Sequence, residues 1–183
     1  VWQSEDGRRE SLTWGEASKQ VTQLAEALVE LGEREGDRVA IFMPMCPAVA
    51  IASHACAHVG AVQVPIFSGF AAPAIASRLE DSQAKVVICA DWSLRRGKRM
   101  EMRAVLDETG EHTVIEWSRA TRSWPELVTK QPGTLPPREV DSEAPYLLVY
   151  TSGTTGRPKG ALHVQGGFLV SIAREPAYQC DVK

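Results

Sequence analysis

The stretch 36–67, GDRVAIFMPMCPAVAIASHACAHVGAVQVPIF, decides the fold. Its first apolar run, 39–43, is too short for a helix and is bounded by a proline, which predicts a buried strand. A second proline can open a helix over 47–59 on small apolar residues, and Gly60 can end it. A further apolar run at 61–66 predicts another strand. The stretch therefore predicts a strand–helix–strand unit at the centre of a domain.

A membrane-spanning segment is the competing interpretation, because residues 39–77 contain no Asp, Glu, Lys or Arg. A spanning helix needs about 20 uninterrupted apolar residues. Prolines and glycines divide this run, so the buried unit of a soluble domain is favoured. The visible N-terminus also lacks the charged and apolar segments of an export signal.

Strands and helices alternate on both sides of this unit. Thr13 and Glu16 have capping-box spacing and predict a helix that Gly32 ends. The other predicted elements are helices at 73–81 and 98–108 and strands at 85–89 and 113–117. This alternation predicts an α/β fold with a mostly parallel sheet flanked by helices on both faces. Prolines make 118–144 a surface excursion with at most one short helix, near 124–129.

Composition excludes several classes of protein. The chain has 183 residues, a formal net charge of −3 and 44% hydrophobic residues, so disorder and a disulfide scaffold are not expected. The charge favours neither a nucleic-acid partner nor a membrane partner, and the tryptophans lack a spacing suited to stacking bases. The four cysteines are far apart in mostly apolar stretches, which is typical of buried, reduced thiols in a cytoplasmic protein. A start at Val1 and no visible stop suggest a piece of a longer protein.

Residues 146–164 predict a strand, a glycine-rich loop and a second strand near the C-terminal end. The loop, TSGTTGRPKG at 151–160, holds three glycines, four hydroxyls, an Arg and a Lys. Successive backbone N–H groups in such a loop form an anion-binding hollow, so a polyphosphate is the expected ligand. The alternatives are a solvated hairpin loop and a Walker loop. Gly160 after Lys159 breaks the Walker pattern.

YTSGTTGRPKG resembles the phosphate-loop signature of the adenylate-forming superfamily. GAVQVPIFSGF, SRLEDSQAKVVICAD and ALHVQGGFLV resemble its acetyl-CoA-synthetase-like branch. The resemblance implies that 1–183 is part of the N-terminal AMP-binding domain of an acyl-CoA synthetase, which converts a short- or medium-chain carboxylic acid to acyl-AMP and then to acyl-CoA. The resemblance assigns the ATP phosphates to Thr151, Ser152, Gly153, Thr154, Thr155, Gly156 and Lys159, with Lys159 catalytic.

The resemblance also implies a CoA site and a magnesium ion. Gly69, Arg95 and Lys98 match the positions that contact the nucleotide end of CoA. Lys98 departs from the family's Arg-x-x-Arg pattern and loses bidentate phosphate recognition. The alternative is a solvated basic helix start at 95–103. The Mg²⁺ ligand, the mobile C-terminal domain and most of the acyl pocket are expected outside these residues, so the piece alone is expected to be inactive.

Two other functions stay open. One is an adenylating enzyme with a different acyl acceptor, and the other is a nucleotide-binding module without catalysis. A metal site is not expected. His54 and His58 lie four residues apart near Cys46 and Cys56, but the zinc-protease pattern needs Glu after the first His, so packed core histidines are expected. His163 is placed either near a nucleotide or on a strand face.

Overall fold

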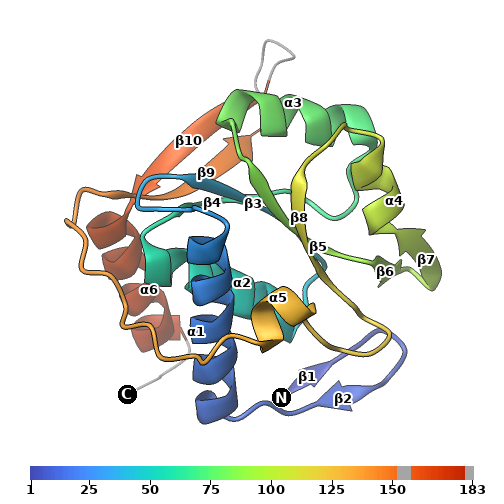
Figure 1. Cartoon of the computed structure of the whole chain (residues 1–183), viewed down its shortest axis with the longest axis horizontal. Coiled ribbons are helices and arrows are strands. Elements are labelled where there is room, and N and C mark those ends of the chain that lie inside the picture. Colours follow the sequence, from blue (N-terminus) through green and yellow to red (C-terminus); the bar gives the residue numbers. More distant parts are fainter. Residues whose placement is uncertain (152–157, 180–183) are drawn as a thin grey trace.

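The computed structural model describes residues 1–151 and 158–179. Its centre is a six-stranded sheet with the strand order β10-β9-β4-β3-β5-β8 (Figure 1). The sheet strands are β3 (Arg38–Phe42), β4 (Val62–Pro65), β5 (Val86–Ala90), β8 (Thr113–Trp117), β9 (Pro145–Thr151) and β10 (Lys159–Val164). The helices are α1 (Trp14–Glu30), α2 (Pro47–Val59), α3 (Ala72–Ser82), α4 (Met102–Asp107), α5 (Glu126–Thr129) and α6 (Gln165–Gln179).

The central unit is confirmed as β3-α2-β4. Pro47 occupies the first turn of α2, and Gly60 ends the helix in the left-handed conformation with φ of 79°. An L-residue with a side chain would be strained there, which explains the glycine. β3 then pairs in parallel with both β4 and β5.

The strand order explains how helices come to cover both faces. From β3 the chain crosses through α2 to β4 on one side, and it returns through α3 to β5 on the other side. Right-handed crossovers in opposite directions place their helices on opposite faces of a sheet. Figure 1 accordingly shows α3 and α4 on one side of the sheet and α1 and α2 on the other. The mostly parallel α/β fold flanked on both faces is confirmed.

The core lies between the sheet and these helices. α1 begins with the expected capping box: Thr13 Oγ1 accepts from the Glu16 amide, and the Glu16 carboxylate accepts from the Thr13 amide at 2.8 Å. The inner face of α1 is fully buried at Leu24 and Leu28, against which α2 packs. The sheet contributes a nearly unbroken run of buried aliphatic side chains through β3 and β5.

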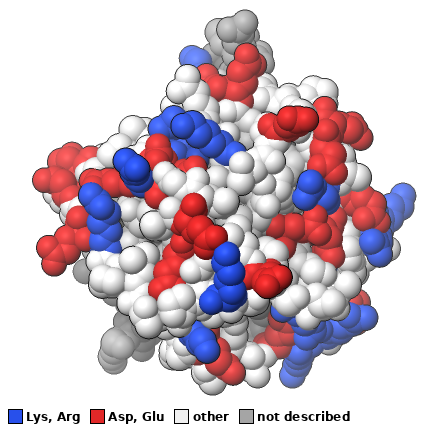
Figure 2. Space-filling model, in the orientation of Figure 1, with Lys and Arg blue, Asp and Glu red and all other residues white. Residues whose placement is uncertain are grey.

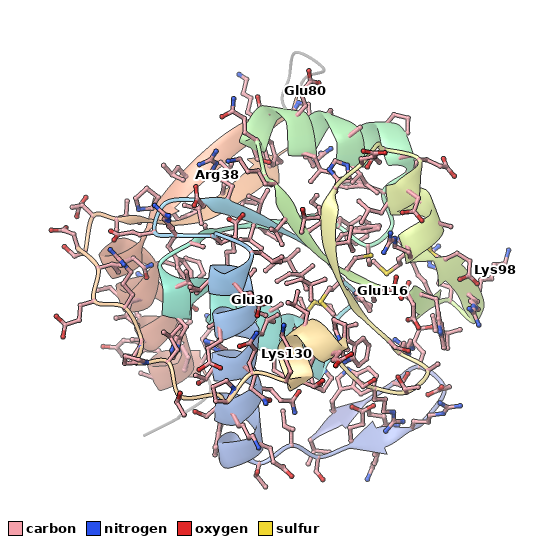
Figure 3. All side chains as sticks on the ribbon, in the orientation of Figure 1. Glu30, Arg38, Glu80, Lys98, Glu116 and Lys130 are labelled. Atoms are coloured by element: carbon pink, nitrogen blue, oxygen red, sulfur yellow. The ribbon has the colours of Figure 1, made fainter. Side chains whose placement is uncertain are left out.

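Residues 118–144 return along α1. α5 buries Val128, and Trp124 just before it is also buried. Residues 130–138, here called the strap, then run beside α1. The Lys130 ammonium lies 2.8 Å from a carboxylate oxygen of Glu30 (Figure 3), and the Arg138 guanidinium lies 2.7 Å from that of Glu35.

The expected helix at 98–108 is wrong over its first part. Residues Lys98–Glu101 form β7, which pairs antiparallel with β6 (Trp92–Arg95), and only α4 is helical. Arg96 and Gly97 make the connecting turn, with φ of 51° and 73°. Two positive φ angles match the right-handed twist of a hairpin, and a glycine in the second position favours it. A second hairpin, β1 (Trp2–Gln3) with β2 (Arg9–Glu10), lies at the N-terminus.

The histidine expectation also needs correction. His54 is exposed, and His58 is half-buried with its Nε2 2.7 Å from the Leu135 carbonyl oxygen of the strap. Their side of α2 faces α1, the strap and solvent. Cys46, Cys56 and Cys89 are buried and free, as expected, whereas Cys180 lies outside the described residues. Among the described residues no helix is long and apolar enough to cross a membrane.

Candidate functional site

The carboxyl ends of the parallel strands meet at one edge of the sheet, and the expected ligand-binding residues follow from that edge. β9 is parallel to β4, and β10 turns back antiparallel beside β9. Thr151 and Lys159 are partners in the last rung of this hairpin. Ligands of open α/β sheets bind at such carboxyl ends. The expected phosphate contacts Ser152, Gly153, Thr154, Thr155 and Gly156 lie outside the described residues.

The rung at the base of the glycine-rich loop faces solvent. Thr151 and Lys159 are both exposed, and Thr151 Oγ1 lies 3.5 Å from the Lys159 carbonyl oxygen. Within residues 1–151 and 158–179, no carboxylate forms an ion pair with Lys159. An exposed cation at this position can serve a polyphosphate, with which charge-assisted hydrogen bonds are strong.

Helix α3 borders the same base. A hollow of about 450 Å³ lies between its C-terminal half and the hairpin, lined by Ser77, Glu80, Asp81, Tyr150 and Pro158. Figure 3 shows Glu80 on α3, at the top of the view. The Tyr150 hydroxyl donates to Asp81 Oδ2 at 2.5 Å, which joins the hairpin to the helix.

The Tyr150 ring is held by a cation as well. The Arg78 guanidinium carbon lies 4.3 Å from the centroid of Phe70 and 5.8 Å from that of Tyr150. Its Nη1 donates to the Ala74 carbonyl one turn earlier in α3. Burial, followed by the hydrogen bond to Asp81 and the charge of that carboxylate, raises the pKa of Tyr150. The hydroxyl therefore stays protonated and remains a donor near neutral pH.

Gly69, Arg95 and Lys98 come together at a second point of this edge. A Cβ added at Gly69 would lie 1.9 Å from Arg95 Nη1, so the guanidinium occupies the space of a side chain there. The same guanidinium carbon lies 5.0 Å from the ring centroid of Phe67, an exposed aromatic residue. Only glycine allows Arg95 to pack in this way.

Lys98 is the cross-strand partner of Arg95 in the β6–β7 hairpin. It is exposed at the outer end of the molecule (Figure 3). Side chains directly opposite on antiparallel strands lie close together, so the two cations share one neighbourhood. Elsewhere acidic and basic side chains are interspersed over the face that Figure 2 shows.

Three residues of the site are absent from the expectations of the sequence. Tyr150 opens the YTSGTTGRPKG signature but receives no role from the sequence, and Arg78 and Asp81 are ordinary polar positions of the helix expected there. The local sequence signal for these residues is a tyrosine next to a predicted ligand loop. That signal does not identify the residues that the tyrosine contacts. His163 is exposed, 5.9 Å from the Phe168 ring, on the strand leading away from the loop. Among the described residues no group of three or more His, Cys, Asp or Glu could hold a metal ion.

Comparison with known proteins gives one family. The family model described as "AMP-binding enzyme" matches residues 1–181. The acetyl-coenzyme A synthetase of Chlorobaculum tepidum is 41% identical over 199 residues, covering 100% of this chain and 30% of the relative. That of Streptomyces coelicolor is 40% identical over 188 residues, covering 94% of this chain and 29% of the relative.

A solved structure shares the architecture. Acetoacetyl-CoA synthetase from Streptomyces lividans matches with a TM-score of 0.84 and 29% identity, over 96% of this chain and 29% of that chain. The chain thus spans about 30% of the length of the curated relatives it matches.

Proposed function

The chain belongs to the AMP-binding enzyme family, and from this membership we propose that it is part of an ATP-dependent acyl-CoA synthetase. The whole enzyme would join a carboxylic acid to ATP, release pyrophosphate, and pass the acyl group from acyl-AMP to the thiol of CoA. The observation that carries the proposal is the Thr151–Lys159 rung, which presents an exposed lysine at the base of the loop that resembles the family's phosphate loop.

Lys159 would act in the first half-reaction only. Negative charge shifts onto the β- and γ-phosphates as pyrophosphate leaves, and a cation already in place stabilises that charge without reorganising. The magnesium ion would supply further charge neutralisation, with its ligands outside the described residues. The second half-reaction has no pyrophosphate to hold, so it does not need this contact.

The test uses the full-length enzyme and two lysine variants. Lys159→Ala should slow acyl-AMP formation by about 10²–10³, the usual cost of losing one such donor, while thioester formation from preformed acyl-AMP changes little. Lys85→Ala is the control, because Lys85 is also exposed but lies just before β5, at the opposite edge of the sheet. Absence of pyrophosphate exchange with every carboxylic acid tried would refute the synthetase, and equal slowing of both half-reactions would refute the role of Lys159.

We further propose that Gly69, Arg95 and Lys98 hold the phosphates at the nucleotide end of CoA. Support comes from the packing of Arg95 on Gly69 and from the cross-strand position of Lys98. Arg95→Ala should raise the KM for CoA and leave acyl-AMP formation unchanged. Arg96→Asn is the matched control, since it removes a neighbouring charge while asparagine tolerates the left-handed turn. An acceptor other than CoA would be indicated if acyl-AMP forms normally and CoA is not consumed.

A further inference from the structure

The base of the phosphate loop lies beyond the point at which β9 pairs with β4. The parallel pairing of β9 with β4 is recorded at Gln63 and Leu147, and β4 ends at Pro65, which has no N–H to donate. Beyond Leu147, the described part of β9 pairs with β10 alone. The rung of Thr151 and Lys159 therefore lies on the part of the hairpin that extends past the paired position of β9 and β4.

The Tyr150–Asp81 hydrogen bond closes this gap. It joins residues 69 positions apart, and its 2.5 Å length lies in the range of a hydroxyl bound to a carboxylate. Asp81 belongs to α3, whose Ile75 and Leu79 are buried in the core, so the acceptor is attached to a rigid element.

The cross-strand partner of Tyr150 is a glycine. A Cβ at Gly160 would lie 2.8 Å from Leu148 Cδ1 and 3.5 Å from Tyr150 Cε1, so both side chains lie across this position. The ring is thereby held between the Gly160 backbone and Arg78, with its hydroxyl directed at Asp81.

We propose that Tyr150 and Asp81 are positioning residues for acyl-AMP formation: their hydrogen bond anchors the Thr151–Lys159 rung to α3 and so holds Lys159 in place for the departing pyrophosphate. The role of Lys159 rests on the function proposed above, whereas the anchoring of the rung does not. Neither Tyr150 nor Asp81 needs to touch substrate.

Activity of the full-length enzyme gives the first test. Tyr150→Phe should slow single-turnover acyl-AMP formation about tenfold, as expected for the loss of one such hydrogen bond, with kcat falling more than the KM for ATP rises. Tyr146→Phe is the matched control: it lies on the same strand, and its ring packs 4.8 Å from the centroid of Phe168. Asp81→Asn keeps an acceptor oxygen and should retain most of the rate, whereas Asp81→Ala should match Tyr150→Phe.

The double variant Tyr150→Phe/Asp81→Ala should be no slower than either single variant, because one bond is lost in each case. Additive losses, or equal rates for Tyr150→Phe and Tyr146→Phe, would overturn the positioning role.

Hydrogen exchange gives a second test that does not depend on catalysis. Tyr150→Phe and Asp81→Ala should each speed exchange of the Thr151 and Lys159 amides several-fold, and Tyr146→Phe should not. Unchanged exchange would overturn the anchor even if the enzyme adenylates a carboxylic acid. A wild-type enzyme without adenylation would instead refute the proposed function, while the exchange data would still decide on the anchor.

Discussion

Glu26 offers the sharpest test of how the strap is held. Its carboxylate accepts from the backbone amides of Gly133, Thr134 and Leu135 at 2.7, 2.7 and 2.8 Å. Successive amides that converge on one anion form a nest, and here the anion is a side chain of α1. Glu26→Ala would leave all three amides without that acceptor.

The expected loss of stability in Glu26→Ala follows from the number of hydrogen bonds removed and from the solvent exposure of Glu26. A hydrogen bond to a charged group contributes about 1.5–3 kcal/mol when it is buried. Glu26 is half-buried, so water can replace part of what is lost. We therefore expect about 2 kcal/mol of local destabilisation in total, which corresponds to about 30-fold faster amide exchange in the strap.

Hydrogen–deuterium exchange on the peptide 131–138 measures this directly. Prolines at 132, 136 and 137 carry no amide hydrogen and the first residue of the peptide carries a free amino group, so four amides report and three of them are bonded to Glu26. Glu30→Ala is the matched control one turn along α1, because within the described part of the chain the Glu30 carboxylate accepts from the side chains of Lys130 and Gln131 and from no backbone amide of the strap. An ordinary surface substitution changes exchange by no more than about twofold. If the strap in Glu26→Ala exchanges within that range of wild type, Glu26 does not hold the strap.

The same carboxylate has a pH signature. Burial acts to raise the pKa of Glu26, but the hydrogen bonds from Thr134, Gly133 and Leu135 outweigh it, so the pKa lies below its ordinary value of 4.5. A group with a lowered folded-state pKa stabilises above its unfolded pKa and loses that contribution as pH falls through the folded one. The difference in free energy of unfolding between wild type and Glu26→Ala should be constant from about pH 7 to pH 5 and shrink below about pH 4. A difference that grows on acidification would contradict the sign.

Three further outcomes are expected. Burial raises the pKa of the Cys56 thiol to about 12, so iodoacetamide at pH 8 should leave it unmodified in the folded protein and alkylate it in urea. Gly60→Ala should lower the free energy of unfolding by about 1 kcal/mol or more, because its φ is 79° and the added Cβ would lie 3.0 Å from Val140 Cγ1. Gly15→Ala should not lower it, because a Cβ at Gly15 has open space around it. The 183-residue chain should bind a hydrophobic dye, and serine at Leu169 and Val170, which are 68% and 70% exposed, should reduce that binding.

Where a local signal determines the backbone, the sequence predicts the structure well. The boundaries of α2 follow from Pro47 and Gly60, and the start of α1 follows from the Thr13–Glu16 capping box. The buried strands follow from short apolar runs bounded by turns. Each of these features depends on residues within a few positions of each other, so no knowledge of the tertiary structure is needed.

The β6–β7 hairpin shows where this reasoning stops. Lys98–Glu101 is polar and contains good helix formers, so composition favours a helix. The structure instead pairs it with Trp92–Arg95, and the Arg99 guanidinium lies 4.7 Å from the Trp92 ring centroid. The overlooked signal is Gly97 after a residue that can take a positive φ. Tertiary pairing overrides a weak helix propensity here.

The same distinction between local and tertiary signals applies to the residues of the candidate site. Thr151 and Lys159 are predicted from the sequence because glycines, hydroxyls and a cation occur together in one loop. Tyr150 and Asp81 are not, because their relation exists only once α3 and β9 lie side by side, 69 residues apart. A loop that must hold a highly charged ligand needs an anchor in the rigid core, and any core element that passes near its base can provide one. The chemistry of such a loop is therefore readable in its own residues, whereas the residues that position it are set by the topology of the sheet and are found only in the structure.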